Sequence, residues 1–292
     1  MSGDSAALLG VHSDALPVEL PAARALPAPG GIGRFIGVDG CRAGWIAVHL
    51  APGAGPRWET VGTGGLGELR PDTGCALVLI DMPIGLPDGS RPVRGCEPEA
   101  RRLLGARRSS VFSPPGRAAL AEASHAGASA ANRRETGRGL SRQAWGIAPK
   151  IAALDQDLRT GAIDPAGLIV WEAHPELCWR AMNGGRPMTH WKRTRAGFRE
   201  RTRLLNGIEP GLGGWIEGQT PRLRGSGAAP DDLVDALGLA IAACRGYPDG
   251  FRALPAKPER DALGVPMQMV YWQPTAGWRA GGNSRPVLEP NP

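Results

Sequence analysis

The sequence lacks paired cysteines and long apolar runs. Its cysteines stand far apart, with no CxxC pair: Cys41, Cys75, Cys96, Cys178 and Cys244. This spacing argues against a zinc site or a redox couple and predicts reduced thiols, as in a cytoplasm. Cys41, close to Asp39, is interpreted as a packed thiol rather than a nucleophile. No stretch approaches the roughly 18 to 20 apolar residues of a membrane helix, so we expect a soluble, cytoplasmic protein with no membrane partner.

Lysine is also scarce, whereas arginine is common. The net charge is +6, and lysine occurs only at positions 150, 192 and 257. Arginine suits bidentate recognition of phosphate. Arg195, Arg199 and Arg203 repeat every four residues, which places them on one helical face suited to a phosphate backbone. Because most such stripes are simply solvated, the charge alone supports a nucleic-acid partner only weakly.

The chain of 292 residues predicts one domain between two tails. Residues 1–33 are rich in Ala and Pro and predict a disordered leader, without the basic start or apolar segment of a signal peptide. Residues 274–292, again rich in Gly and Pro, predict a flexible C-terminal tail. No repeat and no long linker divides residues 34–273, and a hydrophobic content of 42% is enough for a substantial core.

Hydrophobic periodicity predicts a mixed α/β sheet covered on both faces. Strands are expected at 34–39, 45–50, 57–61, 76–81, 168–172 and 267–272. The first two, joined by a turn, predict an antiparallel hairpin, whereas ALVLID and LIVWE are continuous apolar runs typical of buried parallel strands. Helices are expected at 98–104, from 116 through the 120s, after Pro175, and at 141–158, 194–205 and 231–244.

Acidic residues end three of the predicted strands: Asp39, Asp81 and Glu172. Ligands of open α/β sheets bind beyond the carboxyl ends of the strands, so these acids could converge. The helix at 231–244 adds Asp232 and Asp235, three residues apart on the shoulder of its apolar stripe. Asp231 or Asp232 could simply cap the helix. Asp235 lies beyond the cap, so capping does not explain it.

Buried carboxylates without basic partners predict a bound divalent cation. Oxygen-only ligands suit Mg²⁺ or Mn²⁺. Two such ions, about 3.5 to 4 Å apart, can activate a water and stabilise the leaving oxygen in phosphodiester hydrolysis. We therefore expect a metal-dependent nuclease with Asp39 as the central ligand. Asp81 and Asp235 would complete the site, and Asp232 or Glu172 would assist.

Seven motifs resemble one known family in their order: GVDGCRAGW, IDMPIGLP, RRLLGARRSSVF, LSRQAWGIAPKI, WEAHPELCW, KRTRAGFRERTRLL and DDLVDALGLA. Over about residues 34–273 the chain resembles the predicted nucleases with a ribonuclease-H-like fold grouped as domain of unknown function (DUF) 429. The resemblance implies a five-stranded mixed sheet with an antiparallel hairpin, helices on both faces and helical insertions. It also implies a metal site of Asp39, Asp81, Asp232 and Asp235. The DALGLA helix further resembles the catalytic C-terminal helix of bacterial Holliday-junction resolvases.

Other motif residues are substrate-binding candidates: Gln143, Lys150, His174, Glu176, Arg108, Arg42 and Lys192. Lys150 would clamp a phosphate, with Gln143 about two helical turns away. His174 would donate a proton or contact a phosphate, and Glu176 could complete the metal site. The alternatives for Lys150 and His174 are a surface lysine and a packed turn histidine.

Two other functions stay open. An actin-like or sugar-kinase-type ATP-binding enzyme shares this core and also opens on a GxDG hairpin, and ATP turnover would favour it. A non-catalytic binder of nucleic acid or of a metabolite would use the acids structurally and the arginines for binding. Salt-sensitive binding that is unchanged by EDTA and by Asp39→Asn would favour the binder.

Overall fold

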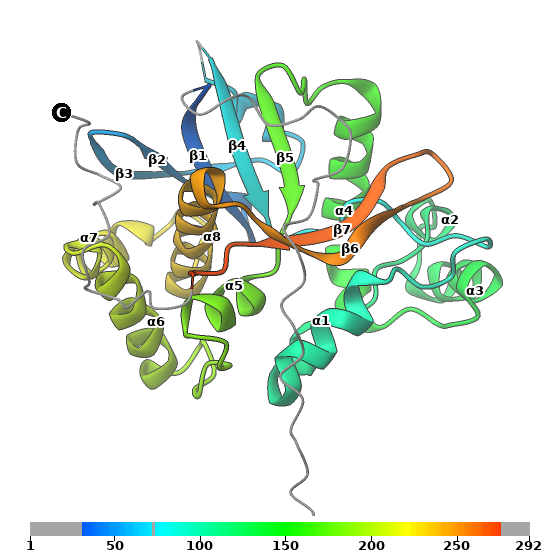
Figure 1. The fold of residues 1–292 in the computed structure, drawn as a ribbon. Coiled ribbons are helices and arrows are strands. Elements are labelled where there is room, and N and C mark those ends of the chain that lie inside the picture. The colour runs from blue at the N-terminus through cyan, green and yellow to red at the C-terminus, as the bar shows by residue number, and fades with distance from the viewer. Residues whose placement is uncertain (1–30, 72–73, 276–292) are drawn as a thin grey trace, which may run out of the picture.

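The structure is a computed structural model that describes residues 31–71 and 74–275. Its centre is a mixed five-stranded sheet of order β3-β2-β1-β4-β5 (Figure 1). The strands are β1 (Ile32–Cys41), β2 (Gly44–Ala51), β3 (Ala54–Val61), β4 (Cys75–Ile80) and β5 (Leu168–Glu172). Strands β1, β2 and β3 run antiparallel, whereas β1, β4 and β5 are parallel. The predicted mixed α/β sheet with its hairpin is confirmed, and the topology is compatible with a ribonuclease-H-like fold.

Helices cover both faces of this sheet, as predicted. They are α1 (Cys96–Leu104), α2 (Arg117–Leu120), α3 (His125–Thr136), α4 (Arg142–Thr160), α5 (Pro175–Met182), α6 (Arg195–Ile208), α7 (Leu212–Gln219) and α8 (Pro230–Asp249). Short 3₁₀ turns lie at Leu66–Leu69, Gly105–Ser110 and Thr220–Leu223. Figure 1 shows α8 (orange) across the sheet, with α5 below the carboxyl ends of β4 and β5.

The strands divide their side chains between two hydrophobic cores. On β4, Leu77 and Leu79 belong to the core that contains α8, whereas Val78 and Ile80 belong to the core that contains α4. Since successive strand residues point to opposite faces, the odd or even position of a residue decides which helix it meets. The same alternation on β1 places position 39 on the α8 face.

The predicted last strand lies outside the main sheet. Residues 267–272 correspond to β7 (Pro266–Tyr271), which pairs antiparallel with β6 (Arg252–Arg260) in a separate two-stranded sheet. Strand β6 was not expected because Pro255 and Pro258 interrupt its pattern, and proline is uncommon inside strands.

The predicted tails fall mostly outside the described residues. Of the leader at 1–33, only residues 31–33 are described, and β1 already begins at Ile32. Of the tail at 274–292, only residues 274–275 are described. Within the described part of the chain, no helix is both long enough and apolar enough to cross a bilayer.

Helix α8 touches the backbone of β1 at Gly37. A Cβ atom at this position would lie 1.9 Å from the carbonyl oxygen of Ala236 and 2.3 Å from the nitrogen of Ala240. No side chain can fit there unless the helix moves away from the strand. The helix residue before Ala236 is Asp235, so this contact sets how close Asp235 comes to the end of β1.

We expect Gly37→Ala to lower the free energy of unfolding by about 3 kcal/mol, the upper part of the usual range for overpacking a core. Gly33→Ala, on the same strand, is the control, because a Cβ atom at Gly33 would meet nothing within 4 Å. That control should change stability by less than about 1 kcal/mol. Denaturant unfolding measures both, and equal effects would show that α8 does not rest on β1 at Gly37.

Candidate functional site

Three aspartates meet on the α8 face of the sheet. Asp39 lies near the end of β1, Asp81 follows the last residue of β4, and Asp235 lies on α8. The two strand ends are level, because the Asp81 N–H donates to the carbonyl of Val38 at 2.9 Å. The negative charges of Asp81 and Asp235 both raise the pKa of Asp39, as expected for carboxylates that lie close together. The structure thus brings together the three acids that the sequence singled out.

Asp39 is the most constrained of these acids. The residue is only 6% exposed. Its Oδ1 accepts a hydrogen bond from the Gly40 N–H at 2.7 Å, whereas its buried Oδ2 has no hydrogen-bond partner among the described residues. Burial, followed by the charge of Asp81, raises the pKa of Asp39 well above its ordinary value. A buried oxygen without a partner is costly, and a cation at this point would remove the cost.

Both carboxylate oxygens of Asp235 accept a hydrogen bond from a side chain. The Trp179 indole donates to its Oδ1 at 2.8 Å, and the Lys192 ammonium donates to its Oδ2 at 2.6 Å. Burial would lower the pKa of Lys192, but the charges of Asp235 and Asp39 outweigh burial and raise it. The expectation that these acids have no basic partner is therefore wrong for Asp235. Its partner was missed because Lys192 lies 43 residues away in the chain.

The loop that carries Lys192 is held by α6. Both carboxylate oxygens of Glu200 accept backbone N–H groups of this loop, from Thr189 at 2.8 Å and from His190 at 2.9 Å. Gly197 allows a close approach, since a Cβ atom there would lie 1.9 Å from the carbonyl oxygen of Trp191. Lys192 is therefore positioned by the fold and is not simply a free surface lysine.

Asp232 combines two functions on α8. Its Oδ2 accepts the Ala229 N–H at 2.9 Å, which is the capping interaction considered from the sequence. Its charge also raises the pKa of Asp39, so it lies near the other acids. Asp231 instead pairs with Arg193 at 3.5 Å and lies 3.9 Å from the Lys192 ammonium.

His174 and Glu176 border Asp81 from the first turn of α5. The charge of His174 lowers the pKa of Asp81, while burial, the largest effect, and the charge of Glu176 raise it. His174 Nδ1 accepts the Glu176 N–H at 3.2 Å, and Nε2 lies 3.3 Å from the carbonyl oxygen of Ser110. By accepting the Glu176 N–H, His174 serves as the N-cap of α5. The packed-turn interpretation of His174 accounts for its contacts, although the ring is close to Asp81.

Glu172 faces away from Asp39, contrary to the sequence-based expectation. Glu172 pairs with Ile80, whose side chain belongs to the α4 core. Glu172 therefore lies on the α4 face of the sheet, opposite to the face of Asp39. Burial raises the pKa of Glu172 to about 8, against the opposing effect of Arg94. The Arg94 guanidinium donates to its Oε2 at 2.5 Å, and the Ile84 N–H donates at 2.7 Å. Glu172 thus anchors the loop after Asp81 rather than joining the three aspartates.

Of the remaining candidates, Lys150 and Arg42 lie next to the end of β1. Lys150, on α4, approaches Gly40 from the other face of the sheet, with its side-chain Cδ 3.6 Å from where a Gly40 Cβ would be. Gln143, Arg108 and Arg42 are exposed. The Arg42 backbone N–H donates to the carbonyl of Gly227 at 3.0 Å, which fixes the β1–β2 turn.

A second buried ionic cluster was not anticipated from the sequence. Cys96, Glu97 and Glu172 have ligand-type atoms within 4.8 Å of one another, the one such group of three in the described part of the chain. Arg94 supplies the cation here, since it also donates to the Cys96 sulfur at 3.0 Å. The three aspartates are more widely spaced than this group. The only signal for the cluster in the sequence is the spacing of Arg94 and Glu97, three residues apart at the start of α1.

We expect Asp39→Asn to stabilise the metal-free protein at neutral pH. The raised pKa of Asp39 means that its ionised form opposes folding, so its contribution to stability is lost as the pH rises through the folded-state pKa. The gain should be roughly 1 to 2 kcal/mol and should vanish near the unfolded-state pKa of about 3.9. Thermal unfolding in EDTA across pH measures it.

The control for this titration is Asp88→Asn. Hydrogen bonds from Ser90 lower the pKa of Asp88, so its ionised form supports folding and the substitution should destabilise the protein at neutral pH. That loss should disappear as the pH falls through the lowered pKa. Destabilisation by Asp39→Asn at pH 7 would contradict the description of a strained, buried carboxylate.

Comparison with known proteins assigns a family. The family model described as a protein of unknown function (DUF429) matches residues 37–260, which include all three aspartates and Lys192. No curated protein and no solved structure matches the chain. Since the match covers most of the chain and contains the site, the protein belongs to the DUF429 family.

Proposed function

We propose that this protein is a divalent-metal-dependent phosphodiesterase that acts on nucleic acid. The observation that carries the proposal is the convergence of Asp39, Asp81 and Asp235, with one buried oxygen of Asp39 left without a partner. Three acids from different elements that meet at one point are what metal-assisted hydrolysis of a phosphodiester requires. The fold by itself would support many other activities.

The residues present fit Mg²⁺ or Mn²⁺. Asp39, Asp81 and Asp235 would hold the ion, with Asp232 beside them, and all four offer only carboxylate oxygens. The cluster around Cys96 fits such an ion poorly, because burial raises the pKa of its thiol and Arg94 already neutralises Glu172. A divalent ion at the aspartates would supply an activated water and charge stabilisation at the leaving oxygen.

Lys192 has two roles in this proposal, one without a bound ion and one with the substrate. Without an ion its ammonium neutralises Asp235 and lowers the pKa of Asp39 and of Asp81. Its side chain remains 33% exposed, so it can also reach a phosphate oxygen that approaches from solvent. We infer that Lys192 exchanges Asp235 for the substrate phosphate when an ion takes over the neutralisation of the acids.

An open groove beside Lys192 and Asp232 favours a polyanion as substrate. Its volume is about 590 Å³, and the residues that line it include Lys192, Arg193, Arg195, Phe198 and Asp232. The arginine stripe of α6 continues from it over an exposed helix face at Arg199 and Arg203. Arginines along an open groove suit a phosphate backbone better than a single small phosphate ester.

We expect cleavage of labelled single-stranded, duplex or branched DNA or RNA in Mg²⁺ or Mn²⁺. Asp39→Asn should reduce the cleavage rate by at least roughly a hundredfold, since even residues that only support a metal ligand often cost 10- to 100-fold. Glu217→Gln, an exposed position on α7, is the control and should cleave normally. If none of these substrates is cut, or if Asp39→Asn cuts as fast as the parent, the proposed activity is wrong.

We expect Lys192→Met to bind Mn²⁺ more tightly than the parent protein. The substitution removes the cation that competes for Asp235 while keeping an unbranched side chain of similar length. Isothermal titration with Mn²⁺ should show a gain of roughly tenfold, the equivalent of one favourable charge interaction of about 1.4 kcal/mol. Lys257→Met, on β6, is the matched control. Weaker Mn²⁺ binding by Lys192→Met would show that Lys192 is not a competitor of the ion.

A further inference from the structure

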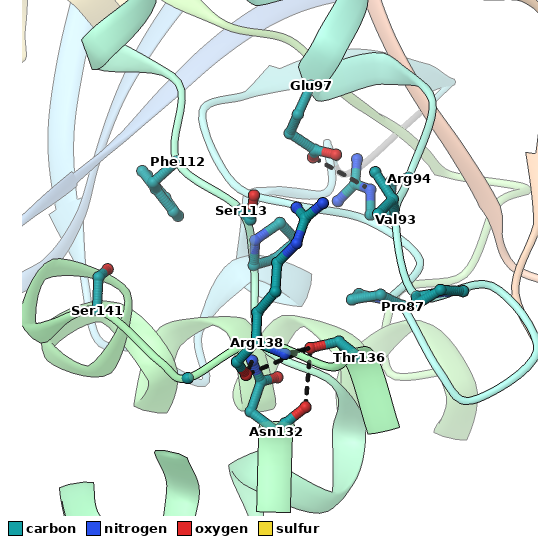
Figure 2. Close-up of a pocket in the computed structure, with 13 residues that line it drawn as sticks. Pro87, Val93, Arg94, Glu97, Phe112, Ser113, Asn132, Thr136, Arg138 and Ser141 are labelled. Carbon is teal, nitrogen blue, oxygen red and sulfur yellow. Dashed lines mark hydrogen bonds and ion pairs between the residues drawn. The ribbon is translucent and has the colours of Figure 1, made fainter. Parts of the chain in front are cut away.

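A cavity between α1 and the end of α3 has no assigned ligand. Its volume is about 290 Å³, near the lower limit of small-molecule pockets at roughly 300 Å³. Figure 2 shows it between the Arg94 segment, the Phe112–Ser113 segment and the end of α3. One wall is apolar and is formed by Phe112 together with prolines at positions 87, 92 and 114.

The inner end of the cavity carries buried charges with unused hydrogen-bonding capacity. Arg94 is 1% exposed and Glu97 is 2% exposed, and they form an ion pair at 3.3 Å. Arg94 Nη1 has no hydrogen-bond partner among the described residues, and Glu97 Oε1, the oxygen of this ion pair, accepts no hydrogen bond of good geometry. A buried donor beside a buried acceptor, both on the wall of a cavity, matches a ligand edge that presents an acceptor beside a donor.

Arg138 adds a separate positive charge to the lining of the cavity. Arg138 is exposed, and its side chain extends across the cavity toward Ser113 (Figure 2). The loop that presents it is fixed, because the Asn132 amide donates to the Arg138 carbonyl at 2.9 Å and accepts the Gly116 N–H at 2.9 Å. The Arg138 backbone is therefore held in place, and its exposed guanidinium can meet an anionic group of a ligand bound in the cavity.

The cavity adjoins the aspartates through shared walls. Glu97 and Phe112 line it and also line a narrow gap that contains Asp81 and His174. A ligand in the cavity would thus be separated from the gap that Asp81 lines by Glu97 and Phe112. The shared residues place the cavity on the side of the molecule that carries the proposed reaction centre.

We propose that this cavity binds one unpaired nucleotide of the substrate, a role that rests on the function proposed above. The base lies against Phe112 with its polar edge on Arg94 and Glu97, and Arg138 holds the adjoining phosphate. Every nucleobase presents a donor beside an acceptor on its pairing edge, and aromatic side chains stack on any base. A small dicarboxylate would satisfy the arginines but would leave the apolar wall and Glu97 unused. The substrate is therefore single-stranded or locally unpaired next to the bond that is cut.

The test measures, by isothermal titration in EDTA, the equilibrium binding of the four 5′-mononucleotides to the full chain. We expect at least one to bind, and ribose 5-phosphate, which lacks the base, to bind at least roughly tenfold more weakly. Arg138→Ala should weaken nucleotide binding by roughly tenfold, the usual effect of losing a charge-assisted hydrogen bond. Ser113→Trp, at an exposed position on the cavity wall, should block binding.

Arg134→Ala is the matched control, because Arg134 is an exposed arginine of α3 that does not line the cavity, and it should bind like the parent. The proposal is overturned if no mononucleotide binds, if ribose 5-phosphate binds equally well, or if Ser113→Trp binds unchanged. Because binding in EDTA needs no metal, nucleotide binding without any cleavage would overturn the proposed activity and leave the cavity's role standing. Cleavage of nucleic acid without mononucleotide binding would overturn the proposed role of the cavity and leave the proposed activity standing.

Discussion

The contact of α8 with the backbone of β1 at Gly37 is the constraint on which the site depends. A helix normally stands off a sheet by the thickness of its side chains, but here the backbones of helix and strand touch. Asp235, on the turn of α8 beside this contact, is thereby held near Asp39, and the parallel pairing of β1 with β4 adds Asp81. Three carboxylates are brought together by main-chain packing, which their mutual repulsion cannot easily undo.

The two buried clusters differ in their balance of charge. Around Glu172 the charges are matched, since Arg94 lies against Glu172 and Glu97 and the hydrogen bond to Ile84 holds the loop after Asp81. Around Asp39 the acids outnumber the one ammonium that reaches them, and an oxygen is left without a partner. The first cluster stabilises the loop, whereas the second stores unfavourable energy that a cation would relieve. Such a concentration of perturbed groups is typical of a functional site.

The groove and the cavity differ in shape and in lining. Toward α6 lies an open, arginine-lined groove that suits an extended backbone. Toward α1 and α3 lies a more enclosed cavity with an apolar wall and a buried donor–acceptor pair, which suits a single base. The groove reaches Lys192 and Asp232, and the cavity shares Glu97 and Phe112 with the gap that Asp81 lines, which is why we propose a substrate that combines a backbone with an unpaired nucleotide.

The sequence alone determined where the five strands of the main sheet lie along the chain and predicted the antiparallel hairpin, and it singled out the three aspartates as candidates, because apolar runs and the acids that end them are local patterns. It could not determine which face each acid occupies. Glu172 ends its strand as visibly as Asp81 does, yet the register of β5 against β4 turns it to the opposite face. Lys192, Trp179 and Arg94 were likewise invisible as partners, since each meets its acid across 43, 56 and 78 residues of chain. Pairing over such distances is decided only when the helices pack on the sheet, because register and helix approach are properties of the assembled core and not of any segment.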